Sequence, residues 1–417
     1  MQKTEINNQL FAEAKLYGKE WSLLFHEFSY WLIRSCQQLN IKKLYFFTRE
    51  GAFFIEIVKA LQEKFNLYDL ECHLLSVSRL ATFLPSVNLN SQNAFQRLWN
   101  IYPNQSPEAF FRSLDIADER LKTIYNQEYG GGYDKKILNI GKNLIFNQFL
   151  KSNTVNHIIK KAIESKKILL TEYLKQTNFL DDISLGIVDI GWRGSIQDNI
   201  SLIFPENKIH GFYLGLHHQK KFLSENNFKK AFLFDGNDRA VNQLFICLMR
   251  FVLPLEFLCT PVQSSVKRYI IHKNKVIPET GNKTEISMAD RIISIFQQAV
   301  LDAIASYQLT NNYRIKLCRK IAKQVIWNPK EFQIFFYRNK KFDEEFGLGI
   351  SSQCYPVIES KHATHSVKYV GTWLNSLKKS AWISGYLYNK LPKSLLRTLP
   401  ILYLLYCLLT FDSYLLR

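Results

Sequence analysis

The chain has 417 residues, of which 47% are hydrophobic and 14% aromatic. Such a chain has enough apolar side chains for a sizeable core, which argues against a disordered protein. Lysine and arginine outnumber aspartate and glutamate by 54 to 36, for a formal net charge of +18. This excess favours anionic partners, namely phosphorylated small molecules, nucleic acid or an anionic membrane surface, although a solubilising surface without a partner also explains it.

The sequence favours a cytoplasmic protein. Its seven cysteines are scattered, without a C-x-x-C pair or a Cys/His cluster at zinc spacing, so we expect reduced thiols and no protein-held metal site. The polar N-terminus, MQKTEINNQLFAEAKL, lacks the apolar core of a secretory signal. No run of about 20 apolar residues predicts a transmembrane helix.

The order of the predicted elements indicates an α/β fold. Residues 1–40 are predicted to form an N-terminal helical segment, because apolar and aromatic residues recur at helical spacing through residues 5–40. Four short apolar runs suit buried parallel strands: KKLYFF (42–47), CHLLSV (72–77), LGIVDI (185–190) and IHGFYLGL (209–216). Helix-like patterns follow the first and third runs directly. We therefore predict a doubly wound, mainly parallel sheet of the Rossmann-like type.

The α/β domain is predicted to span residues 41–275, with a helical insertion at about 90–180 between the second and third strands. The insertion contains the glycine-rich stretch YGGGYDKK (129–136), which we interpret as a surface loop, with a lid hinge as the alternative. Residues 276–417 are predicted to form a basic, helical C-terminal region.

The C-terminal region contains an apolar stretch, Leu399 to Phe411, that is too short to cross a bilayer. Lys390, Lys393 and Arg397 precede it, and basic residues beside an apolar segment favour anionic lipid at the inner face of a membrane. A terminal helix docked on the domain core explains the same residues. The sequence does not choose between peripheral membrane contact and docking.

The first candidate ligand loop follows the first strand. Phe47 ends that strand, and Thr48, Arg49, Glu50 and Gly51 lead directly into a helix. The glycine permits a tight turn, the N–H groups at the helix start attract an anion, and Arg49 adds positive charge. Such turns also occur without a ligand, so this interpretation depends on a second loop of the same kind.

That second loop is VDIGWRGSIQDN, at the end of the third strand. Asp189 lies at the carboxyl end of the strand, where ligands bind in open α/β sheets. Gly191 and Gly194 allow close backbone approach, Arg193 can bind phosphate bidentately, and Ser195 can cap the next helix or bind a phosphate. A purely structural turn with Ser195 as an N-cap is the alternative. Because both loops leave parallel strands at one sheet edge, we predict a shared site for a phosphate-bearing ligand.

Further residues are expected near the same edge. Arg79 follows the second strand and adds a third basic loop. His217 and His218 follow the fourth strand without a partner at metal spacing, and we interpret them as structural or solvated histidines. Glu256 lies in an apolar run, where a carboxylate needs a partner or a raised pKa. One of the arginines at positions 49, 79 and 193 can be that partner.

The sequence resembles a bacterial family of polysaccharide-biosynthesis proteins. The resemblance covers residues 40–275 and is carried by five segments in the same order: LYFFTREGAFF, LLSVSRLA, VDIGWRGSIQ, HGFYLGL and PLEFLCTPVQSSVKRY. They resemble the region that follows a haloacid-dehalogenase-like (HAD) phosphatase domain in capsule and O-antigen proteins, often labelled HAD-like hydrolases or glycosyltransferase-associated proteins. The most specific element is D-I-G-W-x-G-S-I-Q. The R-D-G loop of the family is Arg49-Glu50-Gly51 in this chain.

A HAD active site needs an aspartate nucleophile and a second aspartate two residues later, and Gly191 stands at that second position. The order of the loops instead resembles a phosphoribosyltransferase-like fold, to which some bacterial ribofuranosyl transferases are similar. That resemblance implies that residues 48–51 lie at the pyrophosphate of phosphoribosyl pyrophosphate (PRPP), with Mg²⁺, and residues 191–195 at its 5-phosphate. Asp189 would meet the ribose hydroxyls or the cationic transition state. Common members carry two adjacent acids here, whereas Val188 precedes Asp189 in this chain.

We therefore expect a transferase of capsule or lipopolysaccharide synthesis, with Asp189, Arg193 and Glu256 as catalytic residues. Its donor would be a phosphorylated sugar, and its acceptor a glycan or a lipid-linked glycan. The alternatives are a non-catalytic binding or scaffold module of the same assembly machinery, and a HAD-like hydrolase. A nucleic-acid-binding protein is disfavoured, because the basic residues form no dense patch interleaved with aromatic residues.

Overall fold

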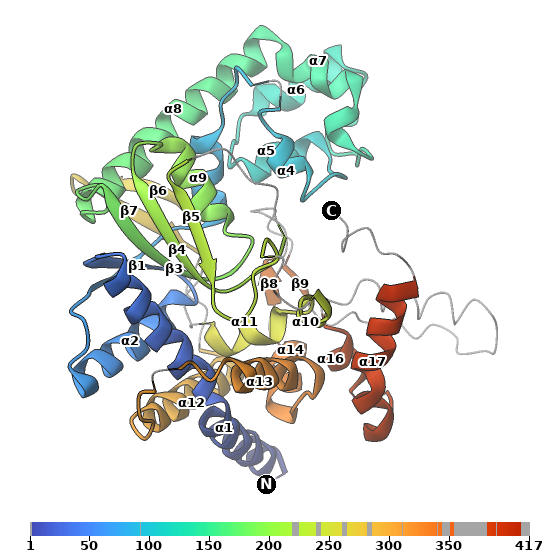
Figure 1. The fold of residues 1–417 in the computed structure, drawn as a ribbon. Coiled ribbons are helices and arrows are strands. Elements are labelled where there is room, and N and C mark those ends of the chain that lie inside the picture. The colour runs from blue at the N-terminus through green and yellow to red at the C-terminus, as the bar shows by residue number, and fades with distance from the viewer. Residues whose placement is uncertain are drawn as a thin grey trace, which may run out of the picture.

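The computed structural model describes residues 2–91, 93–218, 225–238, 243–260, 265–281, 286–310, 312–339, 341–343, 351–353, 382–388 and 390–409. They form a central parallel sheet with helices on both faces, a helical insertion beyond the sheet and a group of C-terminal helices (Figure 1). The protein therefore has the α/β fold with a doubly wound parallel sheet that the sequence predicts.

The central sheet has five parallel strands: β1 (Lys43–Phe47), β2 (Glu71–Leu75), β3 (Ser184–Trp192), β4 (Lys208–Leu216) and β5 (Asn227–Ala231). Their order across the sheet is β2-β1-β3-β4-β5. The chain moves outward from β1 to β2 in one direction, and from β3 through β4 to β5 in the other. Ligands of open α/β sheets bind at such a reversal, outside the carboxyl ends of the two central strands, which are β1 and β3 here.

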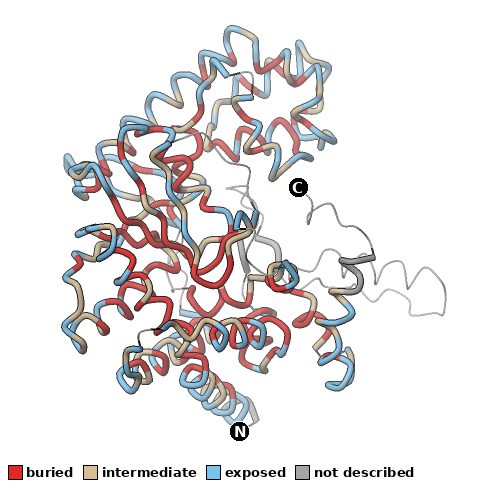
Figure 2. The backbone as a smooth tube through the Cα atoms, in the orientation of Figure 1, coloured by how far each residue is buried: buried red, intermediate tan, exposed pale blue. Residues whose placement is uncertain are grey.

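Both faces of the sheet are buried, which explains why its central strands are almost continuously apolar. Successive residues of a strand point to opposite faces. Leu44 and Phe46 of β1 therefore belong to one core, and Tyr45 and Phe47 belong to the other. Buried residues concentrate along the sheet and on the sides of the helices that face it (Figure 2).

Helices from both ends of the chain cover the first face of the sheet. The predicted N-terminal helical segment is one long helix, α1 (Gln2–Gln38), which packs on α2 (Gly51–Phe65) and most extensively on α12. The rest of this layer comes from the C-terminal half of the chain: α11 (Leu253–Cys259), α12 (Met288–Ile304), α13 (Ile315–Trp327) and α14 (Glu331–Asn339). The N-terminal helix is thus part of the α/β core.

The second face carries α3 (Arg79–Phe83), α9 (Ser195–Ile203), the C-terminal part of α8 (Asn153–Gln176) and a hairpin. The hairpin strands are β6 (Val266–His272) and β7 (Lys275–Thr280). The sequence pattern did not predict this hairpin. Because β7 occupies residues 275–280, the helical part of the C-terminal region begins at α12 and not at residue 276.

The predicted helical insertion has a core of its own. Its elements are the 3₁₀ turn η1 (Leu84–Ser86), α4 (Gln96–Trp99), α5 (Pro107–Ser113), α6 (Glu119–Glu128), the 3₁₀ turn η2 (Ile140–Lys142), α7 (Leu144–Lys151) and the first part of α8. Phe110, Phe146 and Phe149 pack at its centre. The glycine-rich stretch is a turn anchored to this core, because buried Tyr133 accepts a backbone hydrogen bond from Glu108.

The remaining elements are α10 (Gln243–Leu248), β8 (Lys341–Asp343), β9 (Ser351–Gln353), α16 (Ile383–Leu387) and α17 (Lys393–Leu409). Helix α17 includes most of the predicted apolar stretch, of which Thr410 and Phe411 lie outside the described residues. It docks on the core through Tyr403, whose ring lies 5.5 Å from that of Trp327. Another side of α17 remains exposed.

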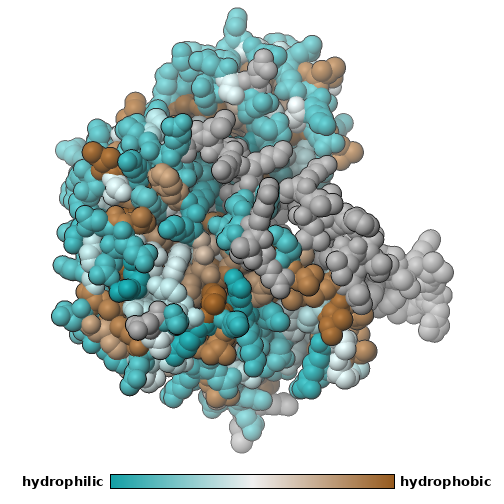
Figure 3. Space-filling view, in the orientation of Figure 1, coloured by the Kyte–Doolittle hydropathy of each residue, from teal (hydrophilic) through white to brown (hydrophobic). Residues whose placement is uncertain are grey.

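That exposed side carries Leu395, Ile401 and Leu402, which are 49%, 62% and 55% exposed. Figure 3 shows hydrophobic side chains gathered at the lower right, where Figure 1 places α16 and α17, and other hydrophobic groups on the same face. Within the described residues, no helix is both long enough and apolar enough to cross a membrane.

Candidate functional site

A cleft of about 1020 Å³ lies at the carboxyl ends of β1 and β3. The loops that follow β1, β2 and β3 form its floor, and α11, the insertion and the hairpin supply its walls. Ten of the eleven site residues expected from the sequence line this cleft: Thr48, Arg49, Glu50, Arg79, Asp189, Gly191, Arg193, Gly194, Ser195 and Glu256. The structure therefore brings together loops that are separated by more than a hundred residues in the chain.

Gly51 is the predicted site residue that does not line the cleft. It is the buried first residue of α2. A Cβ atom there would lie 2.9 Å from the carbonyl carbon of Phe46. This glycine therefore lets α2 start close against β1, which places Arg49 and Glu50 at the cleft.

The β3–α9 loop has an unusual backbone. Gly191, Trp192 and Gly194 have φ values of 115°, 69° and 60°. Glycine adopts such values without cost, whereas a bulky residue such as tryptophan rarely does. The surrounding contacts hold Trp192 in this conformation: its ring stacks on Phe234, and its carbonyl accepts a hydrogen bond from the N–H of His217.

Replacing Gly191 by alanine should destabilise the fold by about 3 kcal/mol, because the residue combines a positive φ with a backbone clash. The added Cβ would lie 2.2 Å from the carbonyl oxygen of Gly215 on β4. Gly131→Ala is the matched control, since Gly131 also has a positive φ but has nothing within 4 Å of the added atom. Urea unfolding measures the free energy of unfolding of both variants. Equal losses of stability in the two would contradict the steric explanation.

The helices that follow β1 and β3 begin without a side-chain cap. Gly194, in the left-handed conformation, is the N-cap of α9, and Ser195 is the first residue of the helix. Of the two alternatives for Ser195, the N-cap role is therefore wrong, because Gly194 in the left-handed conformation is the N-cap. The side chain of Glu50, the N-cap of α2, likewise makes no capping hydrogen bond. In α2 the N–H groups of Ala52 and Phe53 already donate to the carbonyl oxygens of Arg49 and Glu50. The N-terminus of α9 is therefore the better candidate for N–H groups that bind an anion.

Seven carboxyl groups among the described residues line the cleft, and three of them, those of Glu50, Asp189 and Glu256, come from the β1–α2 loop, from the end of β3 and from α11. Burial raises the pKa of Asp189 to about 7, the negative charges of Glu50 and Glu256 add to this effect, and the positive charge of Arg79 opposes it. Such a carboxyl group exchanges its proton near neutral pH, which is the property required of a general acid or base.

Glu256 has a partner that the sequence did not predict. The Nε1 of Trp192 donates a hydrogen bond to its Oε1 at 2.5 Å. Burial raises the pKa of Glu256, as does Glu50, whereas Arg49, the Trp192 hydrogen bond and Arg79 lower it. Two of the three predicted arginine partners thus act on Glu256 through their charge, and the direct hydrogen bond comes from an indole.

The arginines surround the carboxyl groups. The Nη2 of Arg49 lies 3.4 Å from Glu50 Oε1, an ion-pair distance, although that oxygen accepts no hydrogen bond. Arg79 and Arg193 have exposed side chains and line the cleft. Neither has an acidic partner within ion-pair distance among the described residues. Their guanidinium groups are therefore available to an anionic ligand.

Other residues of the cleft did not stand out in the sequence. His217, interpreted above as structural or solvated, lines the cleft, while His218 does not. Burial and the positive charges of Arg193 and Arg250 lower the pKa of His217 to about 4, so its imidazole is neutral at pH 7. Arg250 also lines the cleft, from a segment whose sequence shows no strand or loop motif.

The described residues contain no group of three or more His, Cys, Asp or Glu side chains arranged to hold a metal ion. Mg²⁺, however, is commonly held by one or two carboxylates together with substrate phosphates. Glu50 fits that arrangement, because it lines the cleft and its buried Oε1 accepts no hydrogen bond. The site is thus compatible with Mg²⁺ that arrives with a phosphorylated ligand.

The fold and the cleft define a class of protein: an α/β protein with a doubly wound parallel sheet and a charged cleft at the reversal of its strand order. Neither a scan against protein-family models nor a search of curated proteins gives a match to the chain.

Proposed function

We propose that the protein is a sugar transferase of bacterial surface-polysaccharide synthesis that takes a phosphorylated donor of the PRPP type. The observation that carries the proposal is the meeting of two uncapped strand-to-helix loops, arginines and a carboxyl group of raised pKa in one cleft at the sheet reversal. The resemblance to polysaccharide-biosynthesis proteins supplies the biological setting.

The donor's phosphates match the positive parts of the cleft. The β3–α9 loop, with Arg193 and the N-terminal N–H groups of α9, would bind the 5-phosphate. The β1–α2 loop, with Thr48 and Arg49, would bind the pyrophosphate. Mg²⁺ bound with the donor and held by Glu50 would neutralise part of the pyrophosphate charge.

Asp189 would receive the proton of the acceptor. In the transfer, the bond between the anomeric carbon and the pyrophosphate oxygen breaks, and pyrophosphate leaves with the electron pair. The oxygen of an acceptor hydroxyl forms the new bond to that carbon, and its proton passes to the carboxylate of Asp189. Glu256, held by Trp192, would stabilise the positive charge that develops on the sugar ring.

The geometry disfavours the HAD-like phosphatase alternative. A second catalytic aspartate would have to stand at position 191, where the backbone φ is 115° and a Cβ would lie 2.2 Å from Gly215 O. The backbone therefore leaves no room for a side chain at this position. The loop therefore cannot hold the second aspartate, which is the general acid of the HAD mechanism.

Peripheral contact with the inner face of a membrane is part of the proposal. The exposed Leu395, Ile401 and Leu402 of α17 lie on the same helix as Lys393 and Arg397. An exposed apolar side flanked by positive charges suits an anionic lipid surface. Such a position would bring the cleft near a lipid-linked acceptor.

Calorimetric titration with PRPP and Mg²⁺, and with nucleotide sugars, tests the donor. We expect PRPP to bind, and Arg193→Ala to weaken its binding by a factor of ten or more, because a bidentate contact to phosphate is lost. Arg291→Ala is the matched control, since Arg291 is an exposed arginine on α12 that does not line the cleft. If no activated sugar binds, the protein is a non-catalytic module and the proposal fails.

A further inference from the structure

A second cavity, of about 500 Å³, adjoins the cleft between α8 of the insertion and β6 of the hairpin. It shares part of its lining with the cleft, including Leu80, Asp115, Lys267 and Arg268. A molecule in this cavity can therefore extend into the cleft without leaving the protein. None of the residues in the donor site proposed above belongs to this cavity.

The cavity has an apolar wall. Leu80, Ile158, Leu169 and Tyr269 contribute to it. Tyr269 is held in place, because its ring stacks on that of Tyr173 at 4.7 Å and its hydroxyl donates a hydrogen bond to Ser76 O at 2.9 Å. A fixed aromatic and aliphatic wall suits the C–H face of a sugar ring.

The rim of the cavity is positively charged. Its lining includes five cationic side chains, those of Arg120, Lys161, Lys166, Lys267 and Arg268, and two carboxylates, those of Asp115 and Asp118. Both carboxylates are already paired: Asp115 with Lys166 and Arg268, and Asp118 with Arg120.

Lys161 and Lys267 are exposed. Among the residues that the structure describes, they have no acidic partner within ion-pair distance. They come from α8 and β6, on the two sides of the cavity. Two such lysines facing one cavity leave an uncompensated positive charge that an anionic group can neutralise.

We infer that this cavity binds the acceptor, and that the acceptor is an anionic glycan. The apolar wall would contact a sugar ring, and Lys161 and Lys267 would bind carboxylate or phosphodiester groups of the same chain. Its role in transfer rests on the proposed function, because the acceptor hydroxyl must reach Asp189 in the adjoining cleft. Binding of the glycan itself does not depend on that function.

The test compares three probes of equal length by calorimetry: an oligogalacturonate, an oligomer of glycerol phosphate and a neutral cello-oligosaccharide. The full-length protein should bind at least one anionic probe and bind the neutral one at least tenfold more weakly. The two anionic probes distinguish carboxylate from phosphodiester. Lys161→Glu combined with Lys267→Glu should weaken anionic binding at least tenfold.

Lys160→Glu combined with Lys275→Glu is the matched control, because it makes the same change of charge on the same two elements, α8 and the hairpin, with exposed lysines that do not line the cavity. Equal binding of neutral and anionic probes, or equal losses in the two double variants, would overturn the inference.

Titration of PRPP into the same variants separates the two proposals. If PRPP and nucleotide sugars fail to bind while the anionic glycan still binds through Lys161 and Lys267, the donor proposal fails and the glycan site stands. If PRPP binds and no anionic glycan does, the donor site stands and the acceptor inference fails.

Discussion

Replacing Asp189 by asparagine should lower the rate of sugar transfer by a factor of about 10²–10⁴, the usual contribution of a general base. The amide has the size of the carboxyl group but cannot take a proton from an acceptor hydroxyl. In the wild-type protein, the rate should rise with pH through an apparent pKa near 7, because burial and the charges of Glu50 and Glu256 raise the pKa of Asp189 to about 7. The variant should lack this rise.

The same substitution should stabilise the protein above pH 7. The pKa of Asp189 is about 7 in the fold and 3.8 as a reference, so the folded state binds the extra proton between these values and loses stability as pH rises through them. Asparagine removes this loss. Because the side chain is partly exposed, we expect a gain on the order of 2 kcal/mol at pH 8 and little change near pH 4.

Thermal unfolding at the two pH values checks this, with Asp181→Asn as the control. Asp181 is exposed just before β3, at the opposite end of that strand from the cleft. A variant that loses both activity and stability at pH 8 would indicate a structural role for Asp189. Retained activity in Asp189→Asn would exclude it as the base.

The sequence predicts four of the five strands of the central sheet: the edge strand β2, whose side chains are partly exposed, and β1, β3 and β4, which are largely buried. β1, β3 and β4 match apolar runs because most of their side chains meet one of the two cores. β5, at the other edge of the sheet, was not predicted because two lysines interrupt the apolar pattern of its sequence, NFKKA. Charged residues on an edge strand prevent its association with other chains. The same residues interrupt the apolar run by which a strand is recognised in the sequence.

The hairpin of β6 and β7 was not predicted, for a different reason. Its strands are largely exposed, so burial imposes no clear alternation on them. The available signal was its two-residue turn, in which Lys273 and Asn274 have φ values of 47° and 60°. Asparagine favours this conformation, but lysine does not, and the turn therefore lacks the usual Asn-Gly signature.

The sequence predicts which loops form the candidate site, but it does not predict the contacts between residues far apart in the chain. Parallel strands place their carboxyl ends at one edge, so the residues around Arg49, Arg79 and Asp189 had to come together once the strands were recognised. The Trp192 to Glu256 hydrogen bond joins residues 64 positions apart, through a helix whose place in the fold no local pattern gives. The roles of His217 and Arg250 depend on such packing as well.

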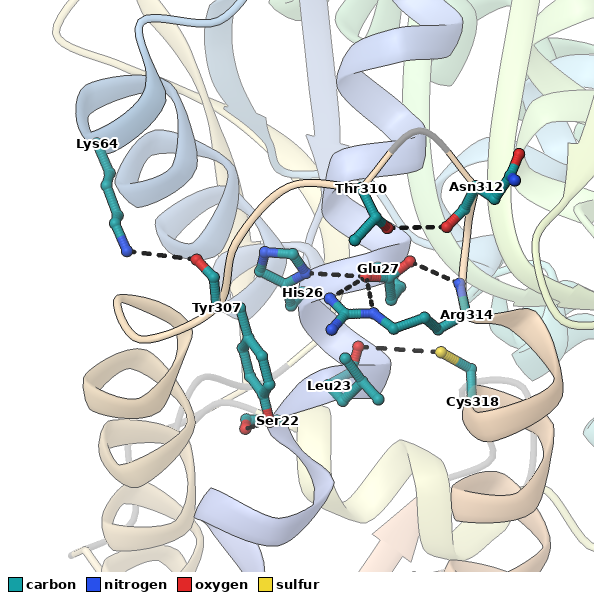
Figure 4. A network of polar contacts seen from close by, with 10 residues as sticks. All are labelled: Ser22, Leu23, His26, Glu27, Lys64, Tyr307, Thr310, Asn312, Arg314 and Cys318. Carbon is teal, nitrogen blue, oxygen red and sulfur yellow. Dashed lines mark hydrogen bonds and ion pairs between the residues drawn. The ribbon is translucent and has the colours of Figure 1, made fainter.

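Replacing Glu27 by glutamine should lower the free energy of unfolding by about 3 kcal/mol at pH 7, because it breaks a buried ion pair and leaves Arg314 without a counter-charge. Glu27 lies on α1 and is 1% exposed. The Nε and Nη2 of Arg314 donate to its Oε1 at 2.9 and 2.6 Å, and the backbone N–H of Arg314 donates to its Oε2 at 2.9 Å. His26 Nδ1 lies 3.3 Å from Oε1 (Figure 4).

These contacts fasten α1 to the segment between α12 and α13. The guanidinium of Arg314 lies 5.4 Å from the centre of the Tyr307 ring, and the hydroxyl of Tyr307 lies 3.0 Å from that of Ser22 on α1 (Figure 4). The network therefore joins the N-terminal helix α1 to the C-terminal helices of the layer that covers the first face of the sheet. A glutamine amide can keep part of the hydrogen bonding but not the charge.

The pH dependence of unfolding tests whether the charge of Glu27 is the cause of this stabilisation. Burial alone would raise the pKa of Glu27, but the hydrogen bonds from His26 and Arg314 and the charge of Arg314 outweigh it and lower the pKa from 4.5 to about 2. A lowered pKa contributes stability above the unfolded value, and this contribution is lost as pH falls from about 4.5 to about 2. The wild-type advantage over Glu27→Gln should therefore shrink across that range.

Urea unfolding at a series of pH values measures the effect. Glu172→Gln is the matched control, since Glu172 pairs with Lys175 on α8 at 2.9 Å but is 49% exposed. Exposed pairs contribute about 0.5 kcal/mol or less, so the control should unfold almost like the wild type. If Glu27→Gln loses no more than the control, or if its deficit stays constant down to pH 2, the buried pair does not stabilise the helical layer through its charge.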